Sequence, residues 1–404
     1  MDSFPWVQKV HVSLFDKCRR YTRPQKIQAA NLYPYFHPIL LSHNATEVTI
    51  EGRRMVMIGS NNYLGLTHHP RVQEAARTAI EEFGTGCSGS RFLNGTLELH
   101  VELERRLAAY FRKEAALTFS TGFQTNLGVL SVLAGKNDLV FCDRENHASI
   151  FDGARLSFGT IKKYRHNDMD DLDRLLGQCD PEAGKLVVTD GVFSMLGDLV
   201  NLPRLSAVAK KHGAKVLVDD AHGVGVLGSG GRGTCEHFGL DVDLITGTFS
   251  KSFASLGGFV VGDADVIQYV KHHARALIFS AAITPSSAAA ALAALDIMER
   301  EPEHRERLRS NVEFMKRGFA KLGFDTNGCE SAIIPLRIGD DAATFMAWRT
   351  LFDQGVFTNA VVPPAVPQGQ SLLRTSYMAT HTREQMTRCL EVFARVGREL
   401  QILQ

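Results

Sequence analysis

Short apolar runs, each followed by a polar residue, recur through the middle of the chain. They lie at residues 116–119, 139–142, 186–189, 215–218, 244–246 and 259–261. Most of these runs are separated by segments of helical length, such as residues 203–212. Strands that alternate with helices predict an α/β fold with a mainly parallel sheet, whose functional residues follow the strand C-termini. Four polar residues occupy such positions: Asp143, Asp190, Asp219 and Thr248.

The two ends of the chain have other patterns. Residues 1–46 predict an N-terminal arm, with one helix and then an irregular segment of aromatic residues and prolines at 33–38. From about residue 285 the pattern changes to long helices, 289–299 and 303–322, followed by two short strands and a final helix at 382–400. We therefore expect an arm (1–46), a large domain (47–288) and a smaller α+β domain (289–404).

Lys251 lies among glycines and small hydroxyl residues, just after the apolar run at 244–246. An amine on the exit loop of a buried strand is held away from water, where its pKa falls and it can form a Schiff base. Thr248 and Ser250 beside it suit phosphate oxygens. Pyridoxal phosphate needs both an imine-forming lysine and a phosphate cup. The alternative is a solvated lysine in a glycine-rich turn.

Asp219 and His222 follow another strand-like run. Pyridoxal phosphate needs a carboxylate against its ring nitrogen to keep that nitrogen protonated, and Asp219 is our candidate. His222 suits a hydrogen bond to the phenolate oxygen of the cofactor. Each residue alone has a common structural explanation, Asp219 as a helix cap and His222 as a satisfied interior histidine. An acid, a histidine and a lysine on consecutive strand exits favour the cofactor site.

Other polar or glycine-rich segments are further candidates for binding the cofactor or the substrates. Gly122 and Phe123 begin a helix, where free backbone amides suit a phosphate. Asn61 and Asn62 follow a strand and suit a substrate-facing loop. The glycine-rich segment 83–91 is either a loop that approaches a ligand closely or a flexible connector. The proline-rich segment 361–367 either lines an acyl pocket or makes an edge connection.

A glycine pattern typical of dinucleotide sites occurs at residues 223–228. Further glycines follow at positions 230, 231 and 233, so the pattern does not open a helix as a dinucleotide site requires. We therefore do not expect a Rossmann-type cofactor.

Composition and charge exclude several further classes of function. The 404 residues carry a net charge of +1, which gives no electrostatic basis for nucleic acid binding. The seven cysteines are scattered without a metal-type cluster, so we expect reduced thiols and no metal site. The charged N-terminus is unlike a signal peptide, and the apolar stretch 281–298 is interrupted by polar residues and a proline. These features predict a cytoplasmic enzyme.

The motifs resemble those of the α-oxoamine synthase family, which are fold-type I pyridoxal phosphate enzymes. The resemblance runs from about Tyr33 to the end of the chain. It is carried by residues 60–65, 89–96, 190–195, 219–222 and 247–251. Within the family the chain is most similar to the bacterial branch that joins L-serine to palmitoyl-CoA. That similarity rests on residues 33–36, 84–96, 165–168 and the proline loop.

The resemblance implies a role for each residue. Lys251 would bind the cofactor covalently and then carry protons, and Asp219 would pair with the ring nitrogen. His222 and Ser194 would contact ring substituents, and His147 would stack on the ring and help to hold the substrate carboxylate. Arg374 would also bind that carboxylate, near Asn62. The phosphate would be held by Gly122, Phe123, Thr248 and Ser250, together with Ser280 and Ala281 from the second subunit of a homodimer.

Two positions depart from the branch, Gly223 where serine is frequent and Val362 where some members carry arginine. The implied reaction is the decarboxylative condensation of L-serine with palmitoyl-CoA to 3-ketodihydrosphingosine. The alternatives are L-alanine with a pimeloyl thioester, as in 8-amino-7-oxononanoate synthases, and glycine with acetyl-CoA, as in glycine C-acetyltransferases. A non-catalytic subunit of the same fold would not need Lys251, Asp219 and His222. Contact of the arm with a membrane surface stays open.

Overall fold

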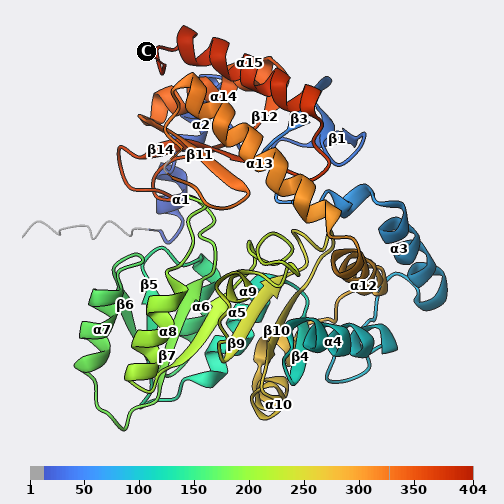
Figure 1. Ribbon diagram of the computed structural model, residues 1–404, viewed down its shortest axis with the longest axis vertical. Coiled ribbons are helices and arrows are strands. Elements are labelled where there is room, and N and C mark those ends of the chain that lie inside the picture. The colour runs from blue at the N-terminus through green and yellow to red at the C-terminus, as the bar shows by residue number, and fades with distance from the viewer. Residues whose placement is uncertain (1–12, 327, 404) are drawn as a thin grey trace, which may run out of the picture.

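A seven-stranded sheet forms the centre of the large domain in the computed structural model, which describes residues 13–326 and 328–403 (Figure 1). In spatial order the strands are β4 (Ala115–Phe119), β10 (Gly258–Gly262), β9 (Leu244–Thr248), β8 (Lys215–Asp219), β7 (Lys185–Asp190), β5 (Leu139–Asp143) and β6 (Thr160–Tyr164). The five strands from β9 to β6 are parallel, whereas β10 is antiparallel to both of its neighbours. The expected mainly parallel sheet is confirmed.

The sheet buries apolar side chains on both faces, as expected for parallel strands covered by helices. One face packs on α5 (Gly122–Leu133), α6 (Ala148–Leu156), α10 (Ala264–His273) and α11 (Arg275–Ile278). The other packs on α4 (Glu98–Phe111), α7 (Met169–Gly177), α8 (Leu202–Lys211) and α12 (Pro285–Arg300). Strand β6 was missed in the sequence because it is an edge strand with two exposed lysines. Such edges lack a continuous apolar run.

The second domain contains α13 (Glu303–Leu322), α14 (Asp341–Asp353) and α15 (Arg383–Glu399), which pack on two small sheets (Figure 1). One sheet has the order β11 (Ile333–Gly339), β14 (Ser371–Ser376) and β13 (Asn359–Val361). The other joins β1 (Ile39–Ser42), β2 (Glu47–Ile50) and β3 (Arg53–Met57) to β12 (Val356–Phe357). Segments from both ends of the chain therefore form this domain.

Both expected domain borders fall within a sheet or a helix. The border at residue 46 falls between β1 and β2 of one sheet, and the border at residue 288 falls inside α12. The apolar side chains of β2 and β3 share one core with Trp348 and Phe393 of the C-terminal segment. Such long-range pairing leaves no signal in a local pattern. The connection to the large domain runs through η1 (Leu66–His68), α3 (Pro70–Phe83) and α12.

The described part of the arm has two short helices, α1 (Asp16–Arg20) and α2 (Arg23–Ala29), where one helix was expected. That expectation is wrong because Pro24 starts a new helix, as proline does in a first turn. The ring of Tyr35 lies 6.5 Å from Phe345 and that of His37 lies 5.2 Å from Trp348, so the arm packs on α14. Residues 1–12 lie outside the described part.

Two observations concern the whole described chain. All seven cysteines fall within it, and each is a free thiol. Within residues 13–326 and 328–403, the helices are too short or too polar to cross a bilayer.

Candidate active site

A cavity of about 260 Å³ lies where the central strands end. Nine of the residues singled out in the sequence line it: Gly122, Phe123, His147, Ser194, Asp219, His222, Thr248, Ser250 and Lys251. They come from loops after five different strands, as the rule for parallel sheets predicts. Asn126, Ser149, Asp190 and Thr246 also line it, although only Asp190 follows one of the runs noted in the sequence.

The amine of Lys251 is buried in this cavity. Burial lowers its pKa to about 8, although the carboxylates of Asp219 and Asp190 act in the opposite direction. The loop that carries it is fixed by Thr248, whose hydroxyl lies 2.8 Å from that of Ser250 and donates to the carbonyl of Gly257 at 3.1 Å. An amine with this pKa is neutral in about a tenth of molecules at pH 7, far more than an ordinary lysine with a pKa of about 10.4, so it is better prepared for nucleophilic attack.

Asp219 is held by a network of hydrogen bonds. Asn126 Nδ2 donates to Asp219 Oδ2 at 2.6 Å, and the backbone N–H of Ala221 donates to Oδ1 at 3.1 Å. Thr246 donates to Asn126 Oδ1 at 2.9 Å and so fixes the direction of the amide. Burial and the neighbouring Asp219 raise the pKa of Asp190 well above its usual value. Of these two acids, Asp190 is therefore the one whose environment favours the protonated form.

His222 pairs with a tyrosine that was not expected at the site. The hydroxyl of Tyr63 lies 2.6 Å from His222 Nδ1. Burial lowers the pKa of His222 well below its usual value, and burial raises the pKa of Tyr63 to about 12. The same hydroxyl lies 3.3 Å from Asn61 Oδ1, but its 2.6 Å contact with Nδ1 is shorter, so we infer that the phenol donates to Nδ1 and that the neutral ring carries its own proton on Nε2. His222 is thereby set as a hydrogen-bond donor at Nε2.

His147 precedes α6 and caps that helix. Its Nδ1 lies 2.7 Å from the hydroxyl of Ser149, and its backbone N–H donates to Asp190 Oδ2 at 2.7 Å. Burial lowers the pKa of His147, so the ring is neutral. The centroids of the Phe123 and His147 rings lie 6.3 Å apart, and the two rings meet edge-on. A flat, neutral ring on the cavity wall is suited to stacking on a planar cofactor.

The start of α5 forms a cup for an anion. A Cβ atom at Gly122 would lie 2.7 Å from Thr248 Cβ, so only glycine allows this close approach. The cup combines free N–H groups of the helix N-terminus with the hydroxyls of Thr248 and Ser250. Backbone N–H groups and hydroxyls together suit a phosphate. The donors, the buried amine and the carboxyl group of Asp219 thus fit pyridoxal phosphate.

Ser280 and Ala281 lie outside this lining in the single chain. The hydroxyl of Ser280 accepts a hydrogen bond from Gln124 Nε2 at 3.0 Å, and Ser120 donates to the carbonyl of Ala281. Both contacts lie beside the beginning of α5. Within one subunit these residues therefore do not reach the cavity.

Arg374 is buried on β14 near the cavity but outside its immediate lining. Its Nε donates to the carbonyl of Ser194 at 2.6 Å, and its Nη2 donates to Asn61 Oδ1 at 3.0 Å. The side chain of Asn62 donates instead to Thr67 at 2.8 Å, within the turn that leads to α3. The structure thus connects Asn61, rather than Asn62, to the guanidinium.

Gly223 is explained by the buried Asp220. A Cβ atom at Gly223 would lie 2.0 Å from Asp220 Oδ1, whose carboxylate accepts hydrogen bonds from Thr234 N at 2.6 Å and Thr234 Oγ1 at 2.7 Å. A serine at this position therefore requires a shift of the Asp220 contacts.

The loop 221–233 makes consecutive turns, and the next helix is the five-residue α9 (Thr234–Phe238). The absence of a helix directly after the 223–228 glycines is confirmed.

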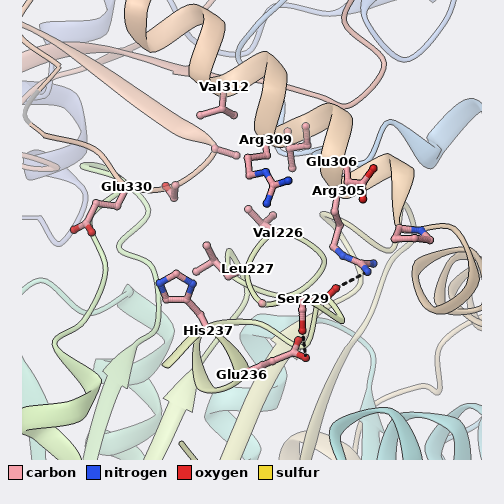
Figure 2. A pocket seen from close by; sticks show the side chains of 15 residues that line it. Val226, Leu227, Ser229, Glu236, His237, Arg305, Glu306, Arg309, Val312 and Glu330 are labelled. Carbon is pink, nitrogen blue, oxygen red and sulfur yellow. Dashed lines mark hydrogen bonds between the residues drawn. The ribbon is translucent and has the colours of Figure 1, made fainter. Parts of the chain in front are cut away.

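A larger cavity of about 680 Å³ lies between α13 and the loop after His222 (Figure 2). Arg305 crosses it and donates to the carbonyl of Ser229 at 2.9 Å, and Ser229 Oγ donates to Glu236 at 3.2 Å. Its lining includes none of the site residues expected from the sequence. The smaller cavity, where an amine, two acids and two histidines converge, is therefore the candidate active site.

Comparisons with known proteins identify the family. The family model for aminotransferase class I and II matches residues 53–393. A serine palmitoyltransferase of Sphingobacterium spiritivorum is 52% identical over 391 residues, which make up 96% of this chain and 98% of that protein. An 8-amino-7-oxononanoate synthase of Symbiobacterium thermophilum is 44% identical over 357 residues, or 88% of this chain and 91% of that one. The chain belongs to the α-oxoamine synthase family.

Solved structures of α-oxoamine synthases have the same fold. A serine palmitoyltransferase from S. paucimobilis with a bound PLP–myriocin aldimine matches with a TM-score of 0.93 and 40% identity, covering 96% of this chain and 98% of that one. The α-oxoamine synthases are acyltransferases that depend on pyridoxal phosphate, and the phosphate cup at α5 fits that cofactor. Tyr63 and Asn126 are among the site residues to which reasoning from the sequence gave no role. Tyr63 lies inside the family motif at 60–65, which was a usable signal, whereas Asn126 lies on a helix with no distinctive pattern.

Proposed function

We propose that this α-oxoamine synthase condenses L-serine with palmitoyl-CoA. The new carbon–carbon bond joins the serine α-carbon to the acyl carbonyl, the thioester C–S bond breaks, and the serine carboxyl group leaves as carbon dioxide. The products are 3-ketodihydrosphingosine, CoA and carbon dioxide. The convergence of Lys251, Asp219 and His222 on one cavity supports the chemistry. The higher identity and coverage of the serine palmitoyltransferases support the substrates.

Bound pyridoxal phosphate supplies an electron sink for negative charge at the α-carbon of the amino acid. Around it, each residue has a definite task. Lys251 Nζ would hold the cofactor and would take the α-proton of the amino acid, as its lowered pKa allows. Asp219 keeps a proton on the ring nitrogen, and Asn126 holds Asp219 in place. His222 donates from Nε2, and Arg374 binds the substrate carboxylate.

The acyl chain is assigned to the apolar cluster beside Ser194. Val361, Val366 and Leu372 are buried there and pack against Met195 and Leu196, which directly follow Ser194 in sequence. Each methylene buried on such a surface contributes about 0.8 kcal/mol, so long chains are favoured. This cluster supports the use of a long-chain thioester.

We also infer a homodimer with shared sites in the cytoplasm. The side chains of Phe92, Leu93 and Phe279 are 58%, 78% and 75% exposed. An isolated backbone bridge between Ser90 and Ala281 places their segments side by side. An exposed apolar group of this kind supports an interface. A second subunit seated there is the proposed source of the Ser280 and Ala281 contacts to the phosphate.

Condensation of L-alanine with a pimeloyl thioester is the alternative. One observation favours it, since Gly223 has no hydroxyl with which to bind the serine side chain. A site without that bond rejects the analogue that lacks the hydroxyl only weakly.

The experiment follows carbon dioxide from carboxyl-labelled L-serine with the purified holoenzyme. We expect release that requires palmitoyl-CoA and equals the free CoA formed, one for one. Release without CoA formation would identify a simple decarboxylase and contradict the proposal.

A further inference from the structure

A hairpin at residues 191–200 links the two domains at the active site. It follows β7, and its arms are joined by a backbone bridge between Val192 and Leu199. Ser194 near its tip lines the cavity, and the Ser194 carbonyl accepts the 2.6 Å hydrogen bond from Arg374 Nε. The position of this hairpin therefore sets the direction of the guanidinium that is assigned to the substrate carboxylate.

His166 fastens the base of the hairpin to the sheet. Its Nδ1 donates to Asp143 Oδ1 at 3.0 Å, and its Nε2 donates to Asp198 Oδ2 at 2.9 Å. Asp143 ends β5 and is fully buried, whereas Asp198 belongs to the hairpin. The His166 ring also meets the Phe193 ring edge-on, with 4.4 Å between the ring centroids. One imidazole thus contacts both the sheet and the hairpin.

The protonation of His166 makes this contact charge-assisted. Burial lowers the pKa of His166, but hydrogen bonds to Asp143 and Asp198 outweigh burial and raise it to about 10. The ring is therefore an imidazolium at neutral pH, and both nitrogens are donors. Asp198 Oδ1 is buried without a partner within residues 13–326 and 328–403. Among the described residues, the carboxylate of Asp198 thus makes its hydrogen bond to His166.

Asn167 adds a second attachment next to the first. Its backbone N–H donates to Asp143 Oδ2 at 2.7 Å, and its side chain donates to the Leu199 carbonyl at 2.9 Å. Its Oδ1 accepts from Asn201 N at 2.8 Å. The segment after β6 therefore holds the returning arm of the hairpin at its base.

We propose that His166 is a positioning residue for amino-acid binding, which bridges Asp143 and Asp198 to hold the 191–200 hairpin and thereby aims Arg374 at the substrate carboxylate. This inference rests on the proposed function, because it takes Arg374 to be the carboxylate-binding group. His166 itself lies outside the cavity lining, so it acts through the hairpin and not on the reacting atoms.

The test measures binding of the amino acid to the holoenzyme without an acyl donor, from the change in cofactor absorbance. We expect His166→Ala and Asp198→Ala each to weaken binding of L-serine on the order of tenfold, as misplacement of a positioning group does. The double variant is expected to bind about as weakly as either single variant, because both remove the same contact. In turnover, KM for the amino acid is expected to rise while kcat stays within about twofold and cofactor content is unchanged.

His212 supplies the matched control. It pairs with Asp173 at 2.6 Å between α7 and α8, outside the cavity lining. His212→Ala is expected to leave amino-acid binding within about twofold. Asp198→Asn, which keeps an acceptor for His166 but removes the charge, tests the same contact if the alanine variants do not fold. It is expected to weaken binding several-fold.

Two results would overturn the proposal. One is unchanged amino-acid binding in His166→Ala, Asp198→Ala or Asp198→Asn. The other is a double variant in which the two single effects multiply. If the wild-type holoenzyme binds L-alanine and not L-serine, the substrate assignment fails, and the same variants are then measured with L-alanine. Failure of the positioning role of His166 and failure of the proposed function are thus separated.

Discussion

The hydroxyl of Tyr63 and Nδ1 of His222 lie 2.6 Å apart, and both side chains are buried. Tyr63 belongs to the loop after β3, whereas His222 follows β8 in the large domain. The pair therefore ties the N-terminal segment to the cofactor site. It also fixes the tautomer of His222, because the protonated phenol donates a hydrogen bond to Nδ1.

Tyr63→Phe removes the donor to His222 Nδ1 and leaves a buried acceptor unpaired. Such a loss costs about 1–3 kcal/mol, so we expect turnover to fall by about tenfold or more while the cofactor stays bound. Steady-state kinetics and cofactor content of the purified variant provide the measurement. Tyr110→Phe is the control, since Tyr110 donates to the Gly230 carbonyl at 3.0 Å, outside the cavity lining. Equal turnover in both variants would rule out this role for Tyr63.

Lys251→Ala removes both the cofactor attachment and the proposed proton carrier. We expect turnover to fall by at least about 100-fold, the lower limit of a general acid–base contribution. Reduction with borohydride followed by mass spectrometry is expected to find the cofactor on Lys251 in the wild type and no adduct in the variant. Lys215→Ala, which removes a surface lysine paired with Asp243, is expected to behave as the wild type. An adduct on another lysine would refute the assignment.

The same lysine sets a pH dependence. Only the neutral amine attacks the cofactor aldehyde, and the pKa of Lys251 is about 8. The rate of cofactor attachment to apoenzyme is therefore expected to rise as the pH increases through about 8 and to level off above it. Stopped-flow absorbance measures this rate. A rate that keeps rising without levelling off above about pH 9, as for an ordinary lysine amine with a pKa of about 10.4, would contradict the lowered pKa.

Asp219→Asn and Asp220→Asn separate chemistry from packing in adjacent residues. Each pKa unit lost at the ring nitrogen corresponds to about 1.4 kcal/mol, so Asp219→Asn is expected to slow α-proton exchange at least about tenfold. Asp220→Asn is expected to lower stability through its bonds to Thr234, with exchange retained. Deuterium incorporation into L-serine, followed by NMR, gives the exchange rates. Undiminished exchange in Asp219→Asn would assign the carboxylate another task.

His166 gives stability a pH dependence of predictable sign. Its pKa is raised from 6.5 to about 10 in the folded protein, so its contribution is complete below pH 6.5 and is lost as the pH rises through about 10. The loss of stability in His166→Ala is therefore expected to be larger at low pH than at high pH. Midpoints of urea unfolding for the wild type and the variant give this difference. A difference that grows with pH would show that the ring is neutral in the folded protein.

Much of the site could be predicted because its residues follow strand ends. Lys251, Asp219 and His222 each follow an apolar run, and the rule for parallel sheets brings such residues together. Asn126 could not be found this way, since its role depends on a contact across 93 residues of sequence. The sheet shared by β1–β3 and β12 was hidden for the same reason. Short strands at opposite ends of a chain give no local sign that they will pair.

The choice of substrates is tested most directly by competition in one reaction. Purified holoenzyme receives equal concentrations of L-serine, L-alanine and glycine together with equal concentrations of palmitoyl-CoA, pimeloyl-CoA and acetyl-CoA, and mass spectrometry identifies the products. We expect 3-ketodihydrosphingosine to be the main product, with some of the matching L-alanine product because Gly223 provides no hydroxyl contact. A main product built from L-alanine and the pimeloyl thioester, or from glycine and acetyl-CoA, would contradict the proposed function.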